Sequence, residues 1–274
     1  MDLFSELQNL MVKYHFRPAK KLSQFYCINE ALLRYLVNSA KLESKDVVLE
    51  IGPGTGFLTR LLLEKCKVVA VEADPNMIEL LNGEFEKEIA SGKLTLVEGD
   101  ILEQDFAKLG VNKIVALPPY HISSGIMTKI ILSHVDSAVL VFDSGFIEKV
   151  VSFEGCMNYN ALTVLTNLNA KAELLERVES ESFFPKPNCV SGVLKLAFDR
   201  KNNSKEFLAF LKELFRHKNK DLSRALKQAA PFLEKELSWK KELTKKFNEM
   251  ELSNSKVYAL SPIDLLEVFE ELNK

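Results

Sequence analysis

Short apolar runs recur along the chain between residues 47 and 198, and polar or glycine-containing turns separate them. Runs of about four to eight residues that are rich in Val and Ile indicate buried strands. We predict seven strands, at residues 47–51, 68–72, 94–98, 113–116, 138–142, 171–178 and 191–198. Helical segments alternate with the first five, which is the pattern of a parallel sheet with helices on both faces.

Helical periodicity marks the segments outside the sheet. Apolar residues at helical spacing predict helices at 2–14, 29–40 and 158–170, the second of them capped by Asn29. Residues 199–204 are polar and typical of a short linker, and from residue 205 onward the pattern is helical, with no strand candidate. We therefore expect a sheet domain at 1–199, with an N-terminal helical extension, and a small all-helical domain at 200–274.

The composition supports two domains with a sizeable core, since 47% of the 274 residues are hydrophobic. No stretch is long and apolar enough to span a membrane, and no basic segment precedes an apolar one at the N-terminus. The four cysteines are scattered, without a C-x-x-C pair. We therefore expect reduced thiols in a cytoplasmic protein, with neither a disulfide framework nor a metal site.

Charge is unevenly distributed, although the net charge of −2 argues against a globally basic nucleic-acid binder. Four cations stand at intervals that would put them on one stripe of a single helix: Arg216, Lys220, Arg224 and Lys227. On charge alone, such a stripe is either a solvated helix face or a surface for phosphates.

The ends of the first four predicted strands carry the candidate chemistry. The first runs into a turn with glycines at positions 52, 54 and 56, a G-x-G-x-G spacing that differs from the dinucleotide fingerprint. Glu72 ends the second strand and could accept hydrogen bonds from both hydroxyls of a ribose. Asp100 follows the third strand, where it could equally cap a helix. The sequence Leu117-Pro118-Pro119-Tyr120 follows the fourth.

Ligands bind beyond the carboxyl ends of strands in such sheets, and the order of these strand ends resembles that of S-adenosylmethionine-dependent methyltransferases. Further segments resemble the KsgA-type ribosomal RNA adenine dimethyltransferases, over about residues 15–270. The segments that carry the resemblance are Lys20-Lys21-Leu22-Ser23-Gln24-Phe25-Tyr26, Pro119-Tyr120-His121-Ile122-Ser123-Ser124, Phe184-Pro185-Lys186-Pro187-Asn188-Cys189-Val190-Ser191 and Phe215-Arg216-His217-Lys218-Asn219-Lys220-Asp221-Leu222.

The resemblance implies a Rossmann-like methyltransferase sheet of about seven strands, with a helical C-terminal domain that binds RNA. It also implies S-adenosylmethionine as cofactor, bound by Gln24, Phe25, Cys27, Gly52, Gly54, Glu72, Asp100 and Leu117. The catalytic positions are then Leu117, Pro118, Tyr120 and Phe184, with the rings of Tyr120 and Phe184 on either face of an adenine. Arg216, Lys220, Arg224 and Lys227 would contact the RNA.

Leu117 departs from the family pattern, which has Asn at this position. An Asn side chain and the following backbone carbonyl both accept hydrogen bonds from the adenine amine in the family. Leucine has no polar side-chain atom, so only the carbonyl of Pro118 remains here. Ser23, Phe25 and Cys27 also replace the Gly, Asn and Leu that the family has beside the cofactor. We therefore expect reduced activity from this chain.

The expected function is N6-dimethylation of two adjacent adenosines near the 3′ end of small-subunit ribosomal RNA, by a monomer that acts on the immature subunit. The alternative is a ribosome-assembly factor of the same fold that has weak or no activity, as Leu117 permits. A methyltransferase acting on DNA or on a small amine is a third hypothesis. The basic residues and the aromatic loop at 183–187 argue against a small substrate.

Overall fold

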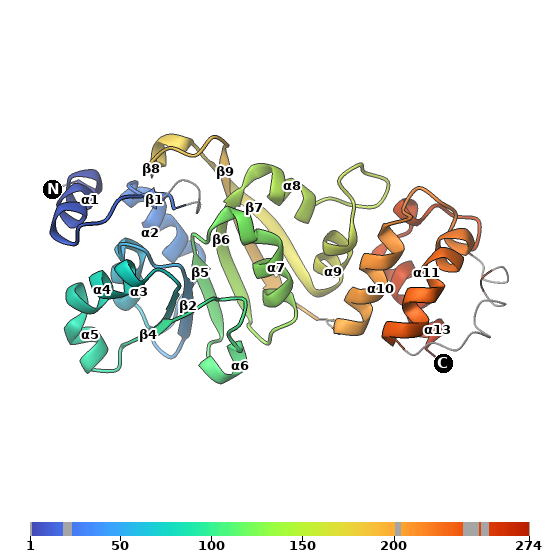
Figure 1. Cartoon of the computed structure of the whole chain (residues 1–274), viewed down its shortest axis with the longest axis horizontal. Coiled ribbons are helices and arrows are strands. Elements are labelled where there is room, and N and C mark those ends of the chain that lie inside the picture. Colours follow the sequence, from blue (N-terminus) through green and yellow to red (C-terminus); the bar gives the residue numbers. More distant parts are fainter. Residues whose placement is uncertain (1, 19–23, 201–203, 238–246, 248–251, 274) are drawn as a thin grey trace. The chain divides into compact units, whose positions relative to one another are not determined.

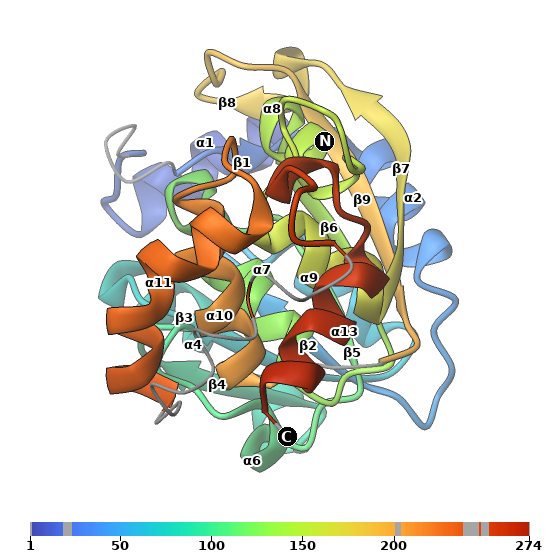
Figure 2. The same ribbon diagram turned by 90° about the vertical axis from the view of Figure 1, so that its right-hand side faces the viewer.

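A computed structural model describes residues 2–18, 24–200, 204–237, 247 and 252–273. The chain divides into two compact units (Figures 1 and 2). The first comprises Met1–Ile147 and Glu173–Phe198, and the second comprises Glu148–Ala172 and Asp199–Lys274. Within the described ranges, no helix combines the length and the apolar character that a bilayer crossing requires.

The first unit contains a sheet of seven strands in the order β4-β3-β2-β5-β6-β9-β7, which confirms the expected sheet. Strands β2 to β6 run parallel to their neighbours, whereas β9 is antiparallel to β6. The strands span Val47–Ile51 (β2), Lys67–Glu72 (β3), Leu94–Glu98 (β4), Lys113–Ala116 (β5), Ser137–Asp143 (β6), Ala170–Val178 (β7) and Ser191–Phe198 (β9). A separate two-stranded sheet pairs β1 (Tyr26–Cys27) with β8 (Phe183–Phe184).

The strand order reverses between β2 and β5, because the chain leaves β2 toward β3 and leaves β5 toward β6. Right-handed crossovers then put their helices, α3 and α7, on opposite faces of the sheet. The helices of this part are α1 (Leu3–Lys13), α2 (Glu30–Ser39), α3 (Phe57–Leu63), α4 (Pro75–Glu84), α5 (Glu86–Ala90), α6 (Phe106–Leu109), α7 (Ser123–Ile131) and α8 (Ser144–Val150).

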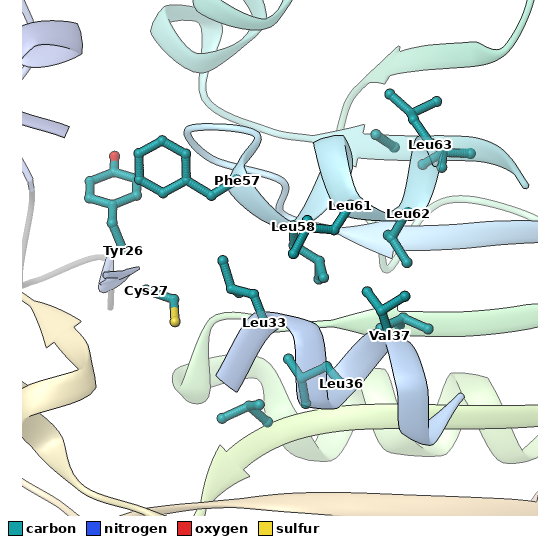
Figure 3. Packing of buried hydrophobic residues seen from close by; sticks show 14 of the residues in the cluster. Tyr26, Cys27, Leu33, Leu36, Val37, Phe57, Leu58, Leu61, Leu62 and Leu63 are labelled. Carbon is teal, nitrogen blue, oxygen red and sulfur yellow. The ribbon is translucent and has the colours of Figure 1, made fainter. Parts of the chain in front are cut away.

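Helices α2 and α3 form the core on one face of the sheet. Figure 3 shows the leucines of the two helices pointing toward one another, among them Leu33 and Leu36 from α2 and Leu58 and Leu62 from α3. All four side chains are buried. The N-cap of α2 is the predicted one, since the Asn29 side chain accepts a hydrogen bond from the Leu32 backbone N–H.

Among the described residues, the second unit contains helices α9 (Ala161–Asn169), α10 (Lys205–Phe215), α11 (Leu222–Leu237) and α13 (Pro262–Leu272). Helices α10, α11 and α13 are visible in Figure 2. Phe207, Phe210 and Phe269 pack together at its centre, with ring centroids 5.1 to 6.2 Å apart.

Residues 148–172 group with these helices, although we expected them in the sheet domain. The reason lies in their hydrogen bonds. The hydroxyl of buried Tyr159 donates to the Leu260 carbonyl at 2.9 Å, and the Gly155 N–H donates to the Tyr258 carbonyl at 2.8 Å.

Candidate active site

A cavity opens at the point where the strand order reverses, beyond the carboxyl ends of β2 and β5. Its volume is about 660 Å³ including the space at its open mouth. The turn after β2 approaches the turn after β5 closely here, since a Cβ on Gly52 would stand 3.7 Å from Pro119 Cδ. The lining includes Gln24, Phe25, Tyr26, Cys27, Glu50, Gly52, Gly54, Glu72, Met77, Leu117 and Pro119.

The glycine turn after β2 tolerates no side chain at two of its positions. Gly54 and Gly56 have φ angles of +55° and +78°, in the left-handed region that disfavours other residues. A Cβ on Gly54 would stand 3.1 Å from the Tyr26 ring, and one on Gly56 would stand only 2.4 Å from the Phe85 ring. The backbone of this turn lines the cavity at Gly52 and Gly54, whereas Gly56 packs against Phe85.

Glu72 lies at the end of β3 and joins that strand to the glycine turn. One carboxylate oxygen accepts hydrogen bonds from the N–H groups of Ala73 and Asp74, and the other accepts one from the Gly54 N–H at 3.1 Å. Burial raises the pKa of this carboxyl, and the three N–H donors oppose that shift. A carboxylate has about four acceptor positions, so the oxygen facing Gly54 can accept a further hydrogen bond from a ligand.

Glu50 is a cavity residue to which the sequence analysis gave no role. It is 2% exposed in β2, and its carboxyl accepts a hydrogen bond of 2.6 Å from the Thr59 hydroxyl of α3. Burial raises its pKa to about 8, and the charge of Glu72 acts in the same direction. The signal was available in the sequence, because an acidic residue inside an apolar strand must be paired or neutral.

The segment before α2 forms another wall of the cavity. Gln24, Phe25, Tyr26 and Cys27 all line it. Contacts of Gln24, Phe25 and Cys27 with the cofactor stay a prediction. The Gln24 amide donates to Asp74 Oδ2 at 2.7 Å, so its side chain also joins this wall to the N-terminus of α4. The part of the expected segment at residues 20–23 lies outside the described residues.

The turn after β5 carries the predicted catalytic residues. Leu117 lines the cavity, and Pro118 is buried beside it. The Tyr120 ring lies 5.9 Å from the Phe25 ring at an interplanar angle of 39°. Its hydroxyl shares a hydrogen bond of 2.6 Å with the Ser191 hydroxyl, which fixes the far end of the ring.

The two aromatic residues of β8 differ in environment. Phe183 is buried in the core and Phe184 is half-buried. The Phe184 ring meets the edge of the Phe4 ring of α1, with centroids 5.2 Å apart. Helix α1 is itself fastened by an Arg60–Glu6 ion pair of 3.1 Å. The stacking of Phe184 on an adenine stays a prediction.

Asp100 is exposed and is not among the residues that line the cavity. Its carboxylate accepts a hydrogen bond of 2.8 Å from the Leu102 N–H and so caps the following turn. This is the kind of contact that the sequence analysis named as the alternative for this residue. A contact between Asp100 and the cofactor stays a prediction.

The four basic residues do not share one helix, and that expectation was wrong. Helix α10 ends at Phe215 with Arg216 as its C-cap, Lys220 lies in the turn that follows, and α11 begins at Leu222. The break has a physical cause in the backbone. The N–H groups at the start of α11 donate to carbonyls of residues 253 and 255, so the chain leaves the path of α10.

The cations nonetheless stay at the surface. Arg216 and Arg224 are exposed, and each lies near an acid three residues away, with Arg216 Nη1 2.9 Å from Glu213 Oε2. The Lys220 ammonium donates to the Gln228 side chain. We call residues 216–220 the basic turn. Surface ion pairs of this kind contribute little to stability, so these cations remain available to a polyanion.

This fold and this cavity define a class of protein. A mainly parallel seven-stranded sheet with its next-to-last strand antiparallel, and a glycine turn hydrogen-bonded to an acid on the neighbouring strand, are the features of Rossmann-like methyltransferases. A family model described as ribosomal RNA adenine dimethylase matches residues 15–271. The chain therefore belongs to that family.

Individual relatives agree with this assignment. The probable ribosomal RNA small subunit methyltransferase A of Methanopyrus kandleri is 38% identical over 226 residues, which cover 80% of each chain. That of Thermococcus kodakarensis is 34% identical over 276 residues and covers 98% of this chain and 95% of its own.

Two solved structures are similar in fold. A dimethyladenosine transferase from Plasmodium falciparum has a TM-score of 0.77 at 29% identity, and the match covers 89% of this chain and 96% of that one. The 23S rRNA methyltransferase ErmE has a TM-score of 0.62 at 20% identity, over 91% of this chain and all of that one, which supports the fold alone.

Proposed function

We propose that this protein transfers methyl groups from S-adenosylmethionine to the N6 amines of two adjacent adenosines near the 3′ end of small-subunit ribosomal RNA. One observation carries the proposal. The glycine turn, Glu72 and the turn at Leu117–Tyr120 meet at a single cavity, in a chain that the adenine dimethylase family model matches over residues 15–271. The names of the relatives support the small-subunit RNA as substrate.

The cavity has the features that an adenosine-containing cofactor needs. The side-chain-free backbone at Gly52 and Gly54 leaves room along one wall, and Glu72 keeps an acceptor position for a ribose hydroxyl. Phe25 and Leu117 supply apolar surface, and Gln24, Cys27 and Gly52 line the same cavity. Asp100 lies outside this lining, and its contact with the cofactor is part of the proposal. When bound, S-adenosylmethionine supplies a methyl group on a positively charged sulfur.

The residues of this chain would then orient the adenine amine. Stacking between Tyr120 and Phe184 contributes about 1–3 kcal/mol per base. The base must leave its helix or already be unpaired to reach such a pocket. The carbonyl of Pro118 accepts one amine N–H, which favours a pyramidal nitrogen with a free lone pair. Holding that nitrogen in place supplies most of the rate, since positioning alone can lower such a barrier by several kcal/mol.

Leu117 makes the enzyme slow in this proposal, because it provides no acceptor for the second amine proton. Losing one preorganised polar partner typically lowers a rate by about 10²–10³. Leu117→Asn should therefore raise methyl transfer, whereas the apolar control Leu117→Met should leave it near the wild-type rate. The measurement is single-turnover transfer of labelled methyl groups to immature small subunits.

The same assay separates this proposal from the assembly-factor alternative. If the wild type binds subunits and transfers no methyl groups, with or without the Asn, the chain is a binding protein of the same fold. A fast wild-type rate that falls in Leu117→Asn would refute the proposed role of this position.

Cofactor binding has its own test. Glu72→Gln replaces one carboxylate oxygen by an NH₂ group, which cannot accept hydrogen bonds from the backbone N–H groups or from a ribose hydroxyl. Calorimetry should therefore show that the binding free energy of S-adenosylmethionine is weaker by about 1–3 kcal/mol. Equal affinity in a folded variant would remove the role of Glu72 at the ribose.

RNA binding is assigned to Arg216, Lys220, Arg224 and Lys227 in this proposal. Phosphate contacts give an affinity that falls with salt, so changing Arg216, Lys220 and Arg224 to Glu should weaken subunit binding and flatten its salt dependence. Binding that is indifferent to this change would make them a solvated surface. We further propose that the protein works as a monomer in the cytoplasm, which light scattering and cell fractionation test.

A further inference from the structure

The loop at residues 151–160 of the second unit presents two large apolar side chains to solvent. Phe153 is 62% exposed and Met157 is 89% exposed, the highest value among the exposed large hydrophobic side chains of the described residues. Single exposed apolar residues are normal on a protein surface. Phe153 and Met157 stand on one short loop, so a partner that contacts this loop can meet both side chains.

The loop is held in place by hydrogen bonds at both ends and in its middle. Asn167 Nδ2 donates to the Ser152 carbonyl at 3.1 Å, and the Gly155 N–H donates to the Tyr258 carbonyl at 2.8 Å. At the far end, Tyr159 is buried and its hydroxyl donates to the Leu260 carbonyl. The exposure of Phe153 and Met157 is therefore a property of a fixed backbone.

The basic turn lies directly against this loop. The Lys218 ammonium donates to the carbonyls of Met157 and Tyr159, at 2.9 and 3.4 Å, and the Tyr258 N–H donates to the Lys218 carbonyl at 3.1 Å. Lys218 is thus the link between the apolar loop and the cations on either side of it, Arg216 and Lys220. From residue 213 to 227 the chain has five Lys and Arg and two acids, Glu213 and Asp221, and the loop itself carries the exposed Glu154.

We propose that Phe153, Met157 and the basic turn form one surface that binds an unpaired stretch of RNA. The cations contact its phosphates, and Phe153 and Met157 contact the flat face of an unpaired base. Charge and exposed apolar surface together indicate the partner. Arg216 and Lys220 complement phosphates, and Phe153 and Met157 complement bases, and RNA carries one phosphate and one base in every nucleotide. This inference rests on the proposed function and adds a site of base contact outside the active-site cavity.

The test replaces the two apolar side chains without touching a cation. We would compare Phe153→Ser/Met157→Ser with the wild type and with Val12→Ser, a control on α1 that removes an apolar side chain 75% exposed. The probes are protein-free small-subunit RNA and immature small subunits, with no methyl donor present. Thermal unfolding of each variant checks that the fold is kept.

The double variant should bind both probes roughly 5- to 150-fold more weakly, the range expected for losing one stacked base. The slope of affinity against salt should stay as in the wild type. Arg216→Gln/Lys220→Gln should reduce that slope by about 1.4, because two phosphate contacts with a single strand are lost. Val12→Ser should bind as the wild type does.

Two results would overturn the inference. One is equal RNA affinity in the double variant and the wild type. The other is weaker binding to subunits with unchanged binding to protein-free RNA, which would identify a ribosomal protein as the partner of the loop. Both outcomes are independent of turnover, since no methyl donor is present, so a failure here differs from a failure of the proposed enzymatic function.

Discussion

Replacing Glu50 by glutamine should stabilise the protein at neutral and alkaline pH. Glu50 is buried in β2 beside the cavity, and burial raises its pKa to about 8. Glutamine has the shape of the protonated acid and can keep the hydrogen bond from Thr59. The substitution therefore preserves the neutral form of the site and removes the cost of its ionisation.

The magnitude follows from the shift of the pKa between the unfolded and folded states. The ordinary value for a glutamate is 4.5 and the folded value is about 8. The folded state thus binds the proton more tightly, so stability is greatest below pH 4.5 and falls as the pH rises to about 8. At about 1.4 kcal/mol per pH unit, the wild type loses roughly 3 kcal/mol by pH 7 and up to about 5 kcal/mol above pH 8.

Urea unfolding of both proteins, without cofactor, between about pH 5 and pH 8.5 measures this effect. The stability advantage of Glu50→Gln should be small at the acidic end and should grow with pH up to about 8. Other carboxyls cancel in the difference between the two proteins. An advantage that is independent of pH, or a variant that is less stable throughout, would refute the reasoning that Glu50 is neutral in the folded protein.

Two further changes test the packing of the site and of the sheet. Gly56→Ala should lower the free energy of unfolding by about 1–3 kcal/mol, because its Cβ would stand 2.4 Å from the Phe85 ring at a φ of +78°; thermal unfolding measures this loss. Asp46→Asn should destabilise the protein at pH 7, and the loss should vanish as the pH falls below about 4. Burial of Asp46 favours a higher pKa, but hydrogen bonds from Asn112 and Lys113 lower it, so its stabilisation is present above pH 3.8 and lost in acid; urea unfolding across pH measures the difference.

Each of these two changes has an outcome that contradicts it. Gly110→Ala is the control for Gly56→Ala, because Gly110 has a φ of +66° and nothing within 4 Å of an added Cβ. Equal losses in the two alanine variants would mean that backbone strain alone matters. A deficit in Asp46→Asn that persists unchanged into acid would mean that the charge of Asp46 is not the source of its contribution.

The strands and the residues at their ends could be predicted because each is a local property. The apolar run at Val47–Ile51 favours a buried strand, and the glycines after it permit the positive φ angles of a tight turn. In a parallel sheet the carboxyl ends of the strands lie along the same edge. The sequence therefore predicts Glu72 and Leu117, which follow two such strands, at one site, and both line the cavity.

The features that the sequence did not reveal depend on contacts between distant segments. The spacing of Arg216 and Lys220 continues helical periodicity across a break that residues 253–255 impose through hydrogen bonds. Nothing near Gln24 in the sequence indicates that its amide binds Asp74. Phe4 and Phe184 are far apart in the sequence, and no periodicity or motif in either segment indicates that their rings are in contact.

The wall that β1 contributes to the cavity depends on residues that are made much later. Asn29 Nδ2 donates to the Ser182 hydroxyl across 153 positions, next to the pairing of β1 with β8. At about 5–20 residues per second, synthesis of the partner segment follows roughly 8–30 s behind. During that time a nascent chain has its glycine turn and Glu72 but no partner strand for Tyr26 and Cys27. This wall of the cavity therefore forms only after residues 182–184 have been translated, and closing so long a loop also costs entropy.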